Sequence, residues 1–244
     1  MEDVQVAAWI LVVPVKRTAI AKSRLAAAYP QHRPELARAF AADTISAALA
    51  SPLVRAVLVV TDDPQVAADV AAAGARVVPD LPAADTQLGP DSPAAPAYLG
   101  PGQPVGGLNE ALVHGAALAA AEFPGAGVAA LSADLPALRT DELTAALTAC
   151  VSDRSFVIDQ PGTGTTLLAA RPGVALDPRF GVGSALAHQA SGAVPLDLPI
   201  PSVRRDVDTA ADLADAVQLG VGPRTAEVLA IVFGAVAGSD GLAC

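Results

Sequence analysis

Residues 6–15 read VAAWILVVPV, and this apolar run decides the fold class. It is short and rich in valine, as expected of a strand buried on both faces of a sheet. Residues 55–61 (RAVLVVT) and 127–131 (GVAAL) repeat the pattern. Segments of helical character lie between and after these strands, at about 34–50, 65–73, 108–121 and 140–150. Alternating strands and helices predict an α/β fold with a mostly parallel sheet covered on both faces.

The second half of the chain continues the alternation with shorter elements. We expect further strands at 75–78, 155–158, from about 165, and 193–198, and helices within 179–191, at 210–219 and at 225–235. Residues 80–106 break the pattern with many prolines and glycines, which predicts a long loop or insertion. A length of 244 residues fits a single domain with a substantial core.

The overall charge limits the choice of partners. The chain carries a formal charge of −10 and has a pI near 4.6, which argues against nucleic acid or an anionic membrane as partner. Cys150 and Cys244 are too few for a metal cluster, and the acidic start of the chain is unlike a signal peptide. These features predict a reduced, cytoplasmic protein.

One short stretch contrasts with this acidity. Residues 4–34 contain no Asp or Glu, yet they carry Lys16, Arg17, Lys22, Arg24 and Arg33. The stretch leaves the end of the first buried strand, where ligands of such sheets bind. Lysine and arginine there suit phosphate oxygens. A solvated basic surface loop explains the same residues equally well.

Carboxylates follow two other strands. Asp134 comes directly after the strand at 127–131, and Asp206 and Asp208 flank Val207 in a segment expected to be extended. Mg²⁺ prefers oxygen ligands and commonly takes one or two carboxylates together with substrate phosphates. The alternative is capping, of the helix near residue 210 by Asp208 or of a turn by Asp134.

Two more polar residues and two glycine-rich turns complete the candidates. Asp62 ends a strand and could face a nucleotide or belong to the turn before Pro64, and Asn109 opens a helix as a cap would. Residues 162–166 (GTGTT) and 179–184 (RFGVGS) offer amides and hydroxyls that suit a small anion, although each could be an ordinary turn. The three histidines show no metal spacing.

Taken in order, these segments resemble one family. The segments are Pro14-Val15-Lys16, Ala21-Lys22-Ser23-Arg24-Leu25, Ser132-Ala133-Asp134-Leu135-Pro136, Gly162-Thr163-Gly164-Thr165, Arg179-Phe180-Gly181 with Ser184, and Asp206-Val207-Asp208-Thr209. They resemble the guanylyltransferases of deazaflavin coenzyme F-420 biosynthesis over about residues 8–225. The resemblance implies a three-layer α/β/α nucleotide-diphospho-sugar transferase (GT-A-like) fold with a mostly parallel mixed sheet.

The resemblance also implies a reaction and a place for each substrate. GTP would react with the phosphate of phosphoenolpyruvate, or of 2-phospho-L-lactate or 3-phosphoglycerate, and release pyrophosphate. A nucleotide-binding half, about 1–135, would precede an acceptor and metal half, about 136–225. Besides GTP and the phosphorylated acid, the next enzyme of the pathway is a candidate transient partner.

The family pattern assigns roles to individual residues. The expected Mg²⁺ ligands are Asp134, Asp206 and Asp208. The expected phosphoenolpyruvate contacts are Thr165, Gly181 and Ser184. The expected nucleotide contacts are Lys16, Lys22, Arg24, Asp62 and Asn109. Lys22, Asp134 and Asp206 are the expected catalytic residues.

Two other functions remain open on the sequence. A molybdopterin-type guanylyltransferase shares the fold, but Pro14-Val15-Lys16 stands where a Gly-x-Gly-x-Arg loop would be expected. A catalytically silent nucleotide-binding protein would be expected to lack the carboxylates or the loop lysines, and both are present.

Overall fold

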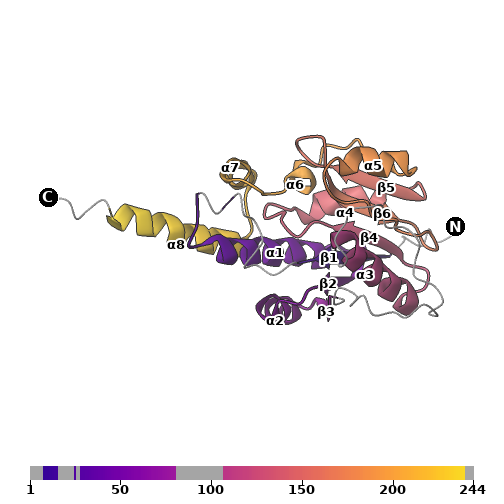
Figure 1. Ribbon diagram of the computed structural model, residues 1–244, viewed down its shortest axis with the longest axis horizontal. Coiled ribbons are helices and arrows are strands. Elements are labelled where there is room, and N and C mark those ends of the chain that lie inside the picture. The colour runs from indigo at the N-terminus through magenta and orange to yellow at the C-terminus, as the bar shows by residue number, and fades with distance from the viewer. Residues whose placement is uncertain (1–7, 16–24, 26–27, 81–106, 240–244) are drawn as a thin grey trace, which may run out of the picture.

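The computed structural model describes residues 8–15, 25, 28–80 and 107–239. Strands and helices alternate along the chain, as the sequence predicts (Figure 1). The elements in chain order are β1 (Trp9–Pro14), α1 (Arg33–Leu49), β2 (Val54–Val60), α2 (Pro64–Ala72), β3 (Arg76–Val78), α3 (Leu108–Glu122), β4 (Gly127–Leu131), α4 (Thr140–Thr148), β5 (Arg154–Ile158), β6 (Thr165–Ala170), α5 (Ser184–Ala190), β7 (Val194–Pro195), α6 (Pro201–Arg204), α7 (Ala210–Leu219) and α8 (Pro223–Ser239).

The strands form one mixed sheet in the order β3-β2-β1-β4-β6-β5-β7. Strand β6 runs antiparallel to both of its neighbours, β4 and β5, and the other pairings are parallel. Side chains of α1, α2, α4 and α6 pack on one face, and those of α3 and α5 on the other. The predicted three-layer α/β/α architecture with a mostly parallel mixed sheet is therefore confirmed.

Strand β1 lies inside the sheet because its residues are apolar on both faces. Leu11 and Val13 belong to the core under α1 and α4, whereas Ile10 and Val12 belong to the core under α3. Helix α3 approaches this strand closely at Gly115, where an added Cβ would lie 2.5 Å from Cγ1 of Val12. A larger residue at Gly115 would push the helix off the sheet.

A third apolar cluster joins distant parts of the chain beside the sheet. Leu36 and Phe40 of α1 pack there with Val207, Leu213 of α7 and Leu229 of α8. Helix α8 packs on α1 and extends away from the sheet (Figure 1). Its first turn is capped from α1, because the buried carboxylate of Asp43 accepts hydrogen bonds from the amides of Arg224 and Thr225, at 3.0 and 2.8 Å.

Two elements differ from the sequence prediction. The strand expected at 193–198 is only Val194–Pro195, followed by one further hydrogen bond, of 2.8 Å, from the amide of Leu196 to the carbonyl of Phe156 in β5. The short helix α6 was not predicted, because four residues are too few to show a helical period. Its last carbonyl, on Arg204, accepts a 2.8 Å hydrogen bond from the amide of Gln160 and so joins the loop after β5.

Cys150 is a structural thiol. Its side chain is buried at the end of α4, and its Sγ donates to the carbonyl of Ala146 at 3.2 Å. Burial raises the pKa of the thiol to about 12, so the thiolate is not formed at neutral pH. Cys244 lies outside the described residues.

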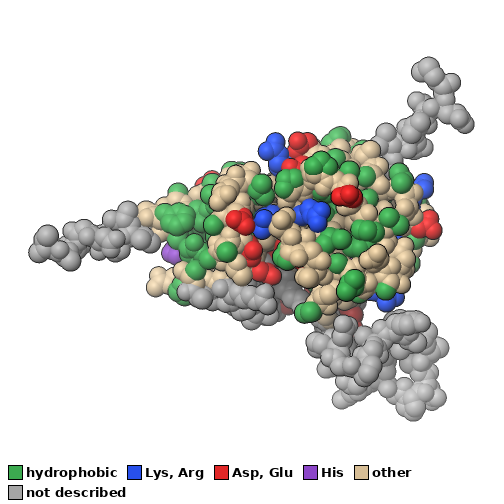
Figure 2. All heavy atoms as spheres, turned by 90° about the horizontal axis from the view of Figure 1, so that it is seen from above, with side chains coloured by type: hydrophobic (Ala, Val, Ile, Leu, Met, Phe, Trp, Pro, Cys, Tyr) green, Lys and Arg blue, Asp and Glu red, His purple; other side chains and the backbone are tan. Residues whose placement is uncertain are grey.

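The surface is mixed in character. Figure 2 shows acidic and basic side chains interspersed among apolar ones on one face, without a continuous basic patch among the described residues. None of the helices in the described ranges has the length and apolar character needed to span a membrane.

Candidate functional site

The sheet topology gathers several predicted residues at one edge. Parallel β2 and β4 end there, followed by Asp62 and Asp134, and antiparallel β6 begins there with Thr165. The amide of Ser132 donates a 2.8 Å hydrogen bond to the carbonyl of Thr166, which ties the segment after β4 to the start of β6. The predicted metal segment and the predicted acceptor segment are therefore neighbours.

The two carboxylate segments are also joined directly. The amide of Val207 donates a 3.0 Å hydrogen bond to the carbonyl of Asp134. Val207 is fully buried, whereas Asp206 and Asp208 on either side of it are half-buried, as alternation in an extended segment predicts. Within residues 8–15, 25, 28–80 and 107–239, no three His, Cys, Asp or Glu side chains lie close enough to hold one metal ion. The trio is thus brought together as neighbouring segments, and its role as metal ligands remains a prediction.

A buried threonine of α1 holds the loop around Asp134. The hydroxyl of Thr44 lies 3.3 Å from the carbonyl oxygen of Ala133 and accepts a 3.1 Å hydrogen bond from the amide of Leu135. The same hydroxyl donates to the carbonyl of Phe40 at 2.8 Å. Sequence reasoning missed Thr44, since a threonine inside a helix carries no signal of a contact 90 residues away.

The predicted capping alternatives turn out differently. Asp208 does not cap α7: Thr209 is the N-cap, and it forms a capping box with Asp212. For Asp62 the alternative was the turn before Pro64, and there the neighbouring Asp63 caps α2 by accepting hydrogen bonds from the amides of Gln65 and Val66. Asp62 stays exposed just before that cap, at the edge where a nucleotide was expected.

Asn109 is not a helix cap either, because the N-cap of α3 is Gly107 and makes no side-chain cap. The amide side chain of Asn109 instead pairs with the backbone of Phe180. Its Nδ2 donates to the carbonyl of Phe180 at 3.0 Å, and its Oδ1 accepts from the amide at 2.8 Å. This double contact holds the loop before Gly181, and a contact of Asn109 with the nucleotide remains a prediction.

The predicted acceptor residues form one connected unit. Ser184 begins α5, and its amide donates to the carbonyl of Gly181 at 3.1 Å. The next amide, of Ala185, donates to the carbonyl of Thr163 at 3.1 Å, which joins the two glycine-rich turns. Gly181 has a backbone φ of +135°, which residues with a side chain rarely adopt.

The turn before Thr165 also requires a glycine. Oδ1 of Asp159 accepts a 2.8 Å hydrogen bond from the amide of Thr163. A Cβ at Gly164 would lie 2.3 Å from Oδ2 of the same carboxylate. The second glycine of the GTGT segment is therefore needed for close approach to Asp159.

A bulge in β6 turns Thr165 toward α5. Val157 pairs with Leu167 and Ile158 pairs with Thr165, so Thr166 is the extra residue. Leu167 faces the core under α1 and α4, and simple alternation would place Thr165 on that side. The bulge reverses this, and Oγ1 of Thr165 lies 2.9 Å from Nδ1 of His188 in α5.

His188 is a residue that the sequence analysis passed over. It is completely buried and stacks at an angle against the rings of Phe156 and Phe180, with centroids 5.8 and 5.1 Å away. Burial lowers the pKa of His188 to about 4, with Arg154 and Arg179 adding to the shift and Asp177 opposing it. The available signal was its spacing of four residues from Ser184, which places both on one face of a helix.

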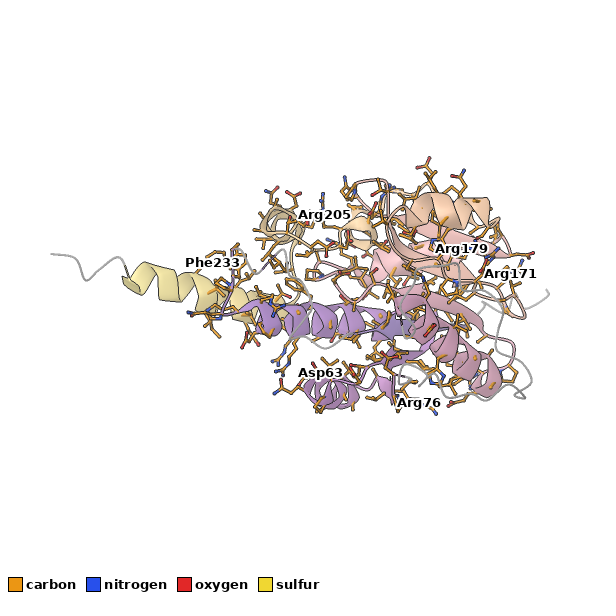
Figure 3. The ribbon with its side chains drawn as sticks, in the orientation of Figure 1. Asp63, Arg76, Arg171, Arg179, Arg205 and Phe233 are labelled. Atoms are coloured by element: carbon orange, nitrogen blue, oxygen red, sulfur yellow. The ribbon has the colours of Figure 1, made fainter. Side chains whose placement is uncertain are left out.

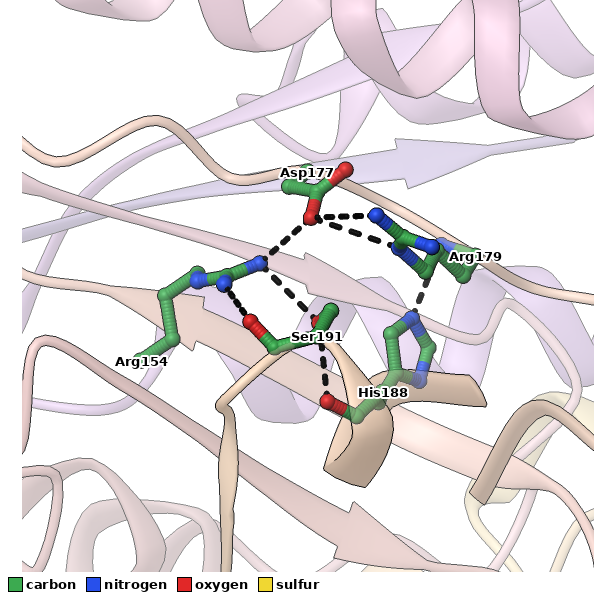
Figure 4. A network of polar contacts seen from close by, with 5 residues as sticks. All are labelled: Arg154, Asp177, Arg179, His188 and Ser191. Atoms are coloured by element: carbon green, nitrogen blue, oxygen red, sulfur yellow. Dashed lines mark hydrogen bonds and ion pairs between the residues drawn. The ribbon is translucent and has the colours of Figure 1, made fainter. Parts of the chain in front are cut away.

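An ion-pair network supports the loop that carries Arg179 (Figure 4). Asp177 has φ +48°, and its carboxylate pairs with Arg154 at 2.8 Å and Arg179 at 3.2 Å. Partial burial alone would raise the pKa of Asp177, but the hydrogen bonds and charges of the two arginines hold it below its ordinary value. Arg154 also donates to the hydroxyl and carbonyl of Ser191 at the end of α5.

Figure 3 shows where these parts lie in the molecule. Arg179 lies near α5 and β5, while Arg205 lies at the end of α6, one residue before Asp206 in the sequence. Asp63, at the start of α2, lies near β3, the outer strand at the other side of the sheet from β7. The predicted triphosphate contacts Lys16, Lys22 and Arg24 lie outside the described residues.

Solved structures share the fold. A nucleotidyl transferase from Methanothermobacter superposes with a TM-score of 0.52 at 14% identity, covering 87% of this chain and 97% of that one. A cytidylyltransferase from Leptospira borgpetersenii gives 0.51 at 9% identity, covering 95% and 96%. A structure assigned as a nucleotide-diphospho-sugar transferase, from Desulfovibrio desulfuricans, gives 0.53 at 16% identity, covering 86% and 96%. The architecture is therefore that of nucleotide-diphospho-sugar transferases.

Curated relatives match over nearly the whole chain, although no family profile matches it. A phosphoenolpyruvate guanylyltransferase from Salinispora arenicola is 54% identical over 222 residues, covering 89% of this chain and 92% of that protein. The protein of the same name from Streptomyces scabiei is 54% identical over 225 residues, covering 91% and 96%. One from Streptosporangium roseum is 43% identical over 219 residues, covering 89% and 88%. This chain belongs to the phosphoenolpyruvate guanylyltransferase family.

Proposed function

We propose that this protein transfers GMP from GTP to phosphoenolpyruvate and releases pyrophosphate. The names of its relatives describe a guanylyl transfer to this acid. The observation that carries the proposal for this chain is the 3.0 Å hydrogen bond from Val207 to Asp134. It joins the two carboxylate segments, and the hydrogen bond from Ser132 to Thr166 ties the first of them to the start of β6, where the acceptor unit begins.

The residues at this edge fit a magnesium ion. Asp134 and the Asp206–Asp208 segment offer carboxylate oxygens from neighbouring backbone, and Mg²⁺ commonly takes one or two such ligands while phosphates and water complete its shell. When bound, the ion would neutralise phosphate charge near the α-phosphorus.

The acceptor phosphate needs no covalent enzyme intermediate. One of its oxygens forms a bond to the α-phosphorus of GTP, the bond from that phosphorus to the oxygen bridging the β-phosphate breaks, and pyrophosphate leaves. The protein has to hold two anions in line and offset their repulsion. We assign the acceptor to Thr165, Gly181 and Ser184, and the nucleotide to the basic residues Lys16, Lys22 and Arg24 with Asp62.

The product would be enolpyruvyl-diphospho-guanosine, an intermediate of deazaflavin coenzyme F-420 biosynthesis. A cytoplasmic setting fits the reduced, buried thiol of Cys150. The next enzyme of the pathway is the partner that we expect to take up the product.

A pyrophosphate-release assay tests the proposal. GTP and ATP are each combined with phosphoenolpyruvate, 2-phospholactate or 3-phosphoglycerate, with and without Mg²⁺. We expect release only with GTP, phosphoenolpyruvate and Mg²⁺ together. Faster release with another acid would make that acid the acceptor. Equal release when ATP replaces GTP would refute selectivity for guanine.

A further inference from the structure

Both ring nitrogens of His188 are occupied by hydrogen bonds inside the protein. Nε2 accepts a 2.9 Å hydrogen bond from the amide of Arg179. Nδ1 lies 2.9 Å from Oγ1 of Thr165. The ring thereby connects the start of β6 with the loop before Gly181, which are the two halves of the acceptor unit.

These two contacts determine the tautomer of His188. A neutral imidazole has one donor nitrogen and one acceptor nitrogen. Because a main-chain amide can only donate, Nε2 must be the acceptor, and the proton must sit on Nδ1. The surroundings favour this neutral ring: it is completely buried between Phe156 and Phe180, and burial disfavours imidazolium.

The tautomer in turn determines what Thr165 can do. Its Oγ1 accepts a hydrogen bond from Nδ1–H, so the hydroxyl must direct its own proton elsewhere. In the described part of the chain the Thr165 hydroxyl has no hydrogen-bond partner other than His188. Thr165 is the first residue of β6, and the hydrogen bond from the amide of Ser132 to the carbonyl of Thr166 ties this end of the strand to the segment that carries Asp134.

We propose that His188 is a positioning residue that fixes the Thr165 hydroxyl as a hydrogen-bond donor to the bound acceptor anion. A hydroxyl free to rotate samples several orientations before the anion binds, and binding must then order it. A hydroxyl whose lone pair is already engaged by Nδ1–H presents the proton. The inference rests on the proposed function for the identity of the anion, phosphoenolpyruvate, but the tautomer does not depend on it.

Long-range ¹H–¹⁵N NMR of the histidine rings tests the tautomer without any substrate. The chain has three histidines, and the signals missing from His188→Gln identify His188. We expect a neutral ring protonated on Nδ1 at pH 7. A ring protonated on Nε2, or on both nitrogens, would overturn the proposal.

Steady-state kinetics test the effect on the acceptor. In His188→Gln, Oε1 can still accept from Arg179, since it lies as many bonds from Cβ as Nε2, but the donor to Thr165 is lost. In His188→Asn, Nδ2 stands where Nδ1 was and can still donate to Thr165. We expect His188→Gln to raise the KM for phosphoenolpyruvate about tenfold, His188→Asn to raise it less, and neither to change the KM for GTP. Equal effects of the two variants, or of one variant on both substrates, would indicate a merely structural role.

The dependence on Thr165 is tested by combining substitutions. Thr165→Val should raise the KM for phosphoenolpyruvate, Thr165→Ser should not, and adding His188→Gln to Thr165→Val should have little further effect. Additive effects would contradict action through the hydroxyl. If the His188 variants do not fold, the Val and Ser variants of Thr165 still decide whether that hydroxyl donates to the anion.

Failure of the proposed function gives a different result. The wild type would then release no pyrophosphate with phosphoenolpyruvate, while the NMR measurement would still report the tautomer. The kinetic comparison is then run with whichever acid supports release.

Discussion

The hydroxyl of Thr44 contacts both peptide groups that flank Asp134. It lies 3.3 Å from the carbonyl oxygen of Ala133 and accepts from the amide of Leu135 at 3.1 Å. Thr44 is completely buried, so water cannot replace these contacts. A buried residue in the middle of α1 thus holds the backbone of the predicted metal ligand.

Replacing Thr44 by valine keeps the shape of the side chain and removes the hydroxyl. The amide of Leu135 then stays buried without a partner, which costs about 1–3 kcal/mol of unfolding free energy. We also expect a lower kcat, because the loop around Asp134 is no longer held. Urea unfolding and pyrophosphate release measure the two effects. Thr44→Ser, which keeps the hydroxyl, is the control, and a valine variant as stable and active as that control would contradict the prediction.

Neutralising the carboxylates should remove activity without unfolding the protein. Asp134→Asn and Asp206→Asn are each expected to lower kcat/KM at least about 100-fold, because each loses a charged carboxylate expected to hold the Mg²⁺ ion that offsets phosphate repulsion. Raising the Mg²⁺ concentration should restore part of the rate if the residue binds the ion. Asp141→Asn, at a carboxylate side chain 74% exposed on α4, is the matched control and should leave the rate unchanged. An active Asp134→Asn variant would show that the metal assignment is wrong.

Asn109 offers a test between two roles. In Asn109→Asp, one oxygen still accepts from the amide of Phe180, but the other faces the carbonyl of Phe180 and repels it. If the residue holds the Gly181 loop, the KM for phosphoenolpyruvate rises and the KM for GTP does not. A rise in the KM for GTP alone would instead support the predicted nucleotide contact.

The stability of the protein should depend on pH through His188. Its pKa is about 4 in the folded chain against an ordinary value of 6.5, so between these values the unfolded chain binds more protons. The contribution of His188 to the unfolding free energy should therefore be constant well above pH 6.5. It should fall as the pH drops toward 4, by up to about 1.4 kcal/mol per pH unit.

The charges that face the ring are Asp177, Arg154 and Arg179. Urea unfolding at several pH values, compared between the wild type and His188→Gln, isolates the contribution of the ring. The fall attributed to His188 must be absent in the variant. An equal pH dependence in both proteins would show that the buried ring is not its source.

Much of the site could be read from sequence because its parts follow strands. Asp134 after β4 and Asp62 after β2 lie at one sheet edge, since the carboxyl ends of parallel strands share that edge. Val207 is apolar between two carboxylates, and alternation alone predicts that it is buried while its neighbours are not.

The cap of α7 was misplaced although it is local. Thr209 rather than Asp208 caps the helix, and Thr209 and Asp212 have the spacing of a capping box in the sequence. Another feature depends on a contact between distant residues. Asn109 pairs with Phe180, 71 residues away, although its position at a helix start is typical of a cap. No local pattern distinguishes this pairing from a cap.

The sequence by itself determined most of the order of strands and helices, the apolar core and the edge at which the polar residues gather, because the hydrophobic period is local and a strand–helix–strand order implies parallel strands. The tertiary structure alone decided which face Thr165 presents. One extra residue in β6 reverses the alternation and joins Thr165 to His188. A bulge arises from the pairing of two strands, and so it cannot be read from either strand alone.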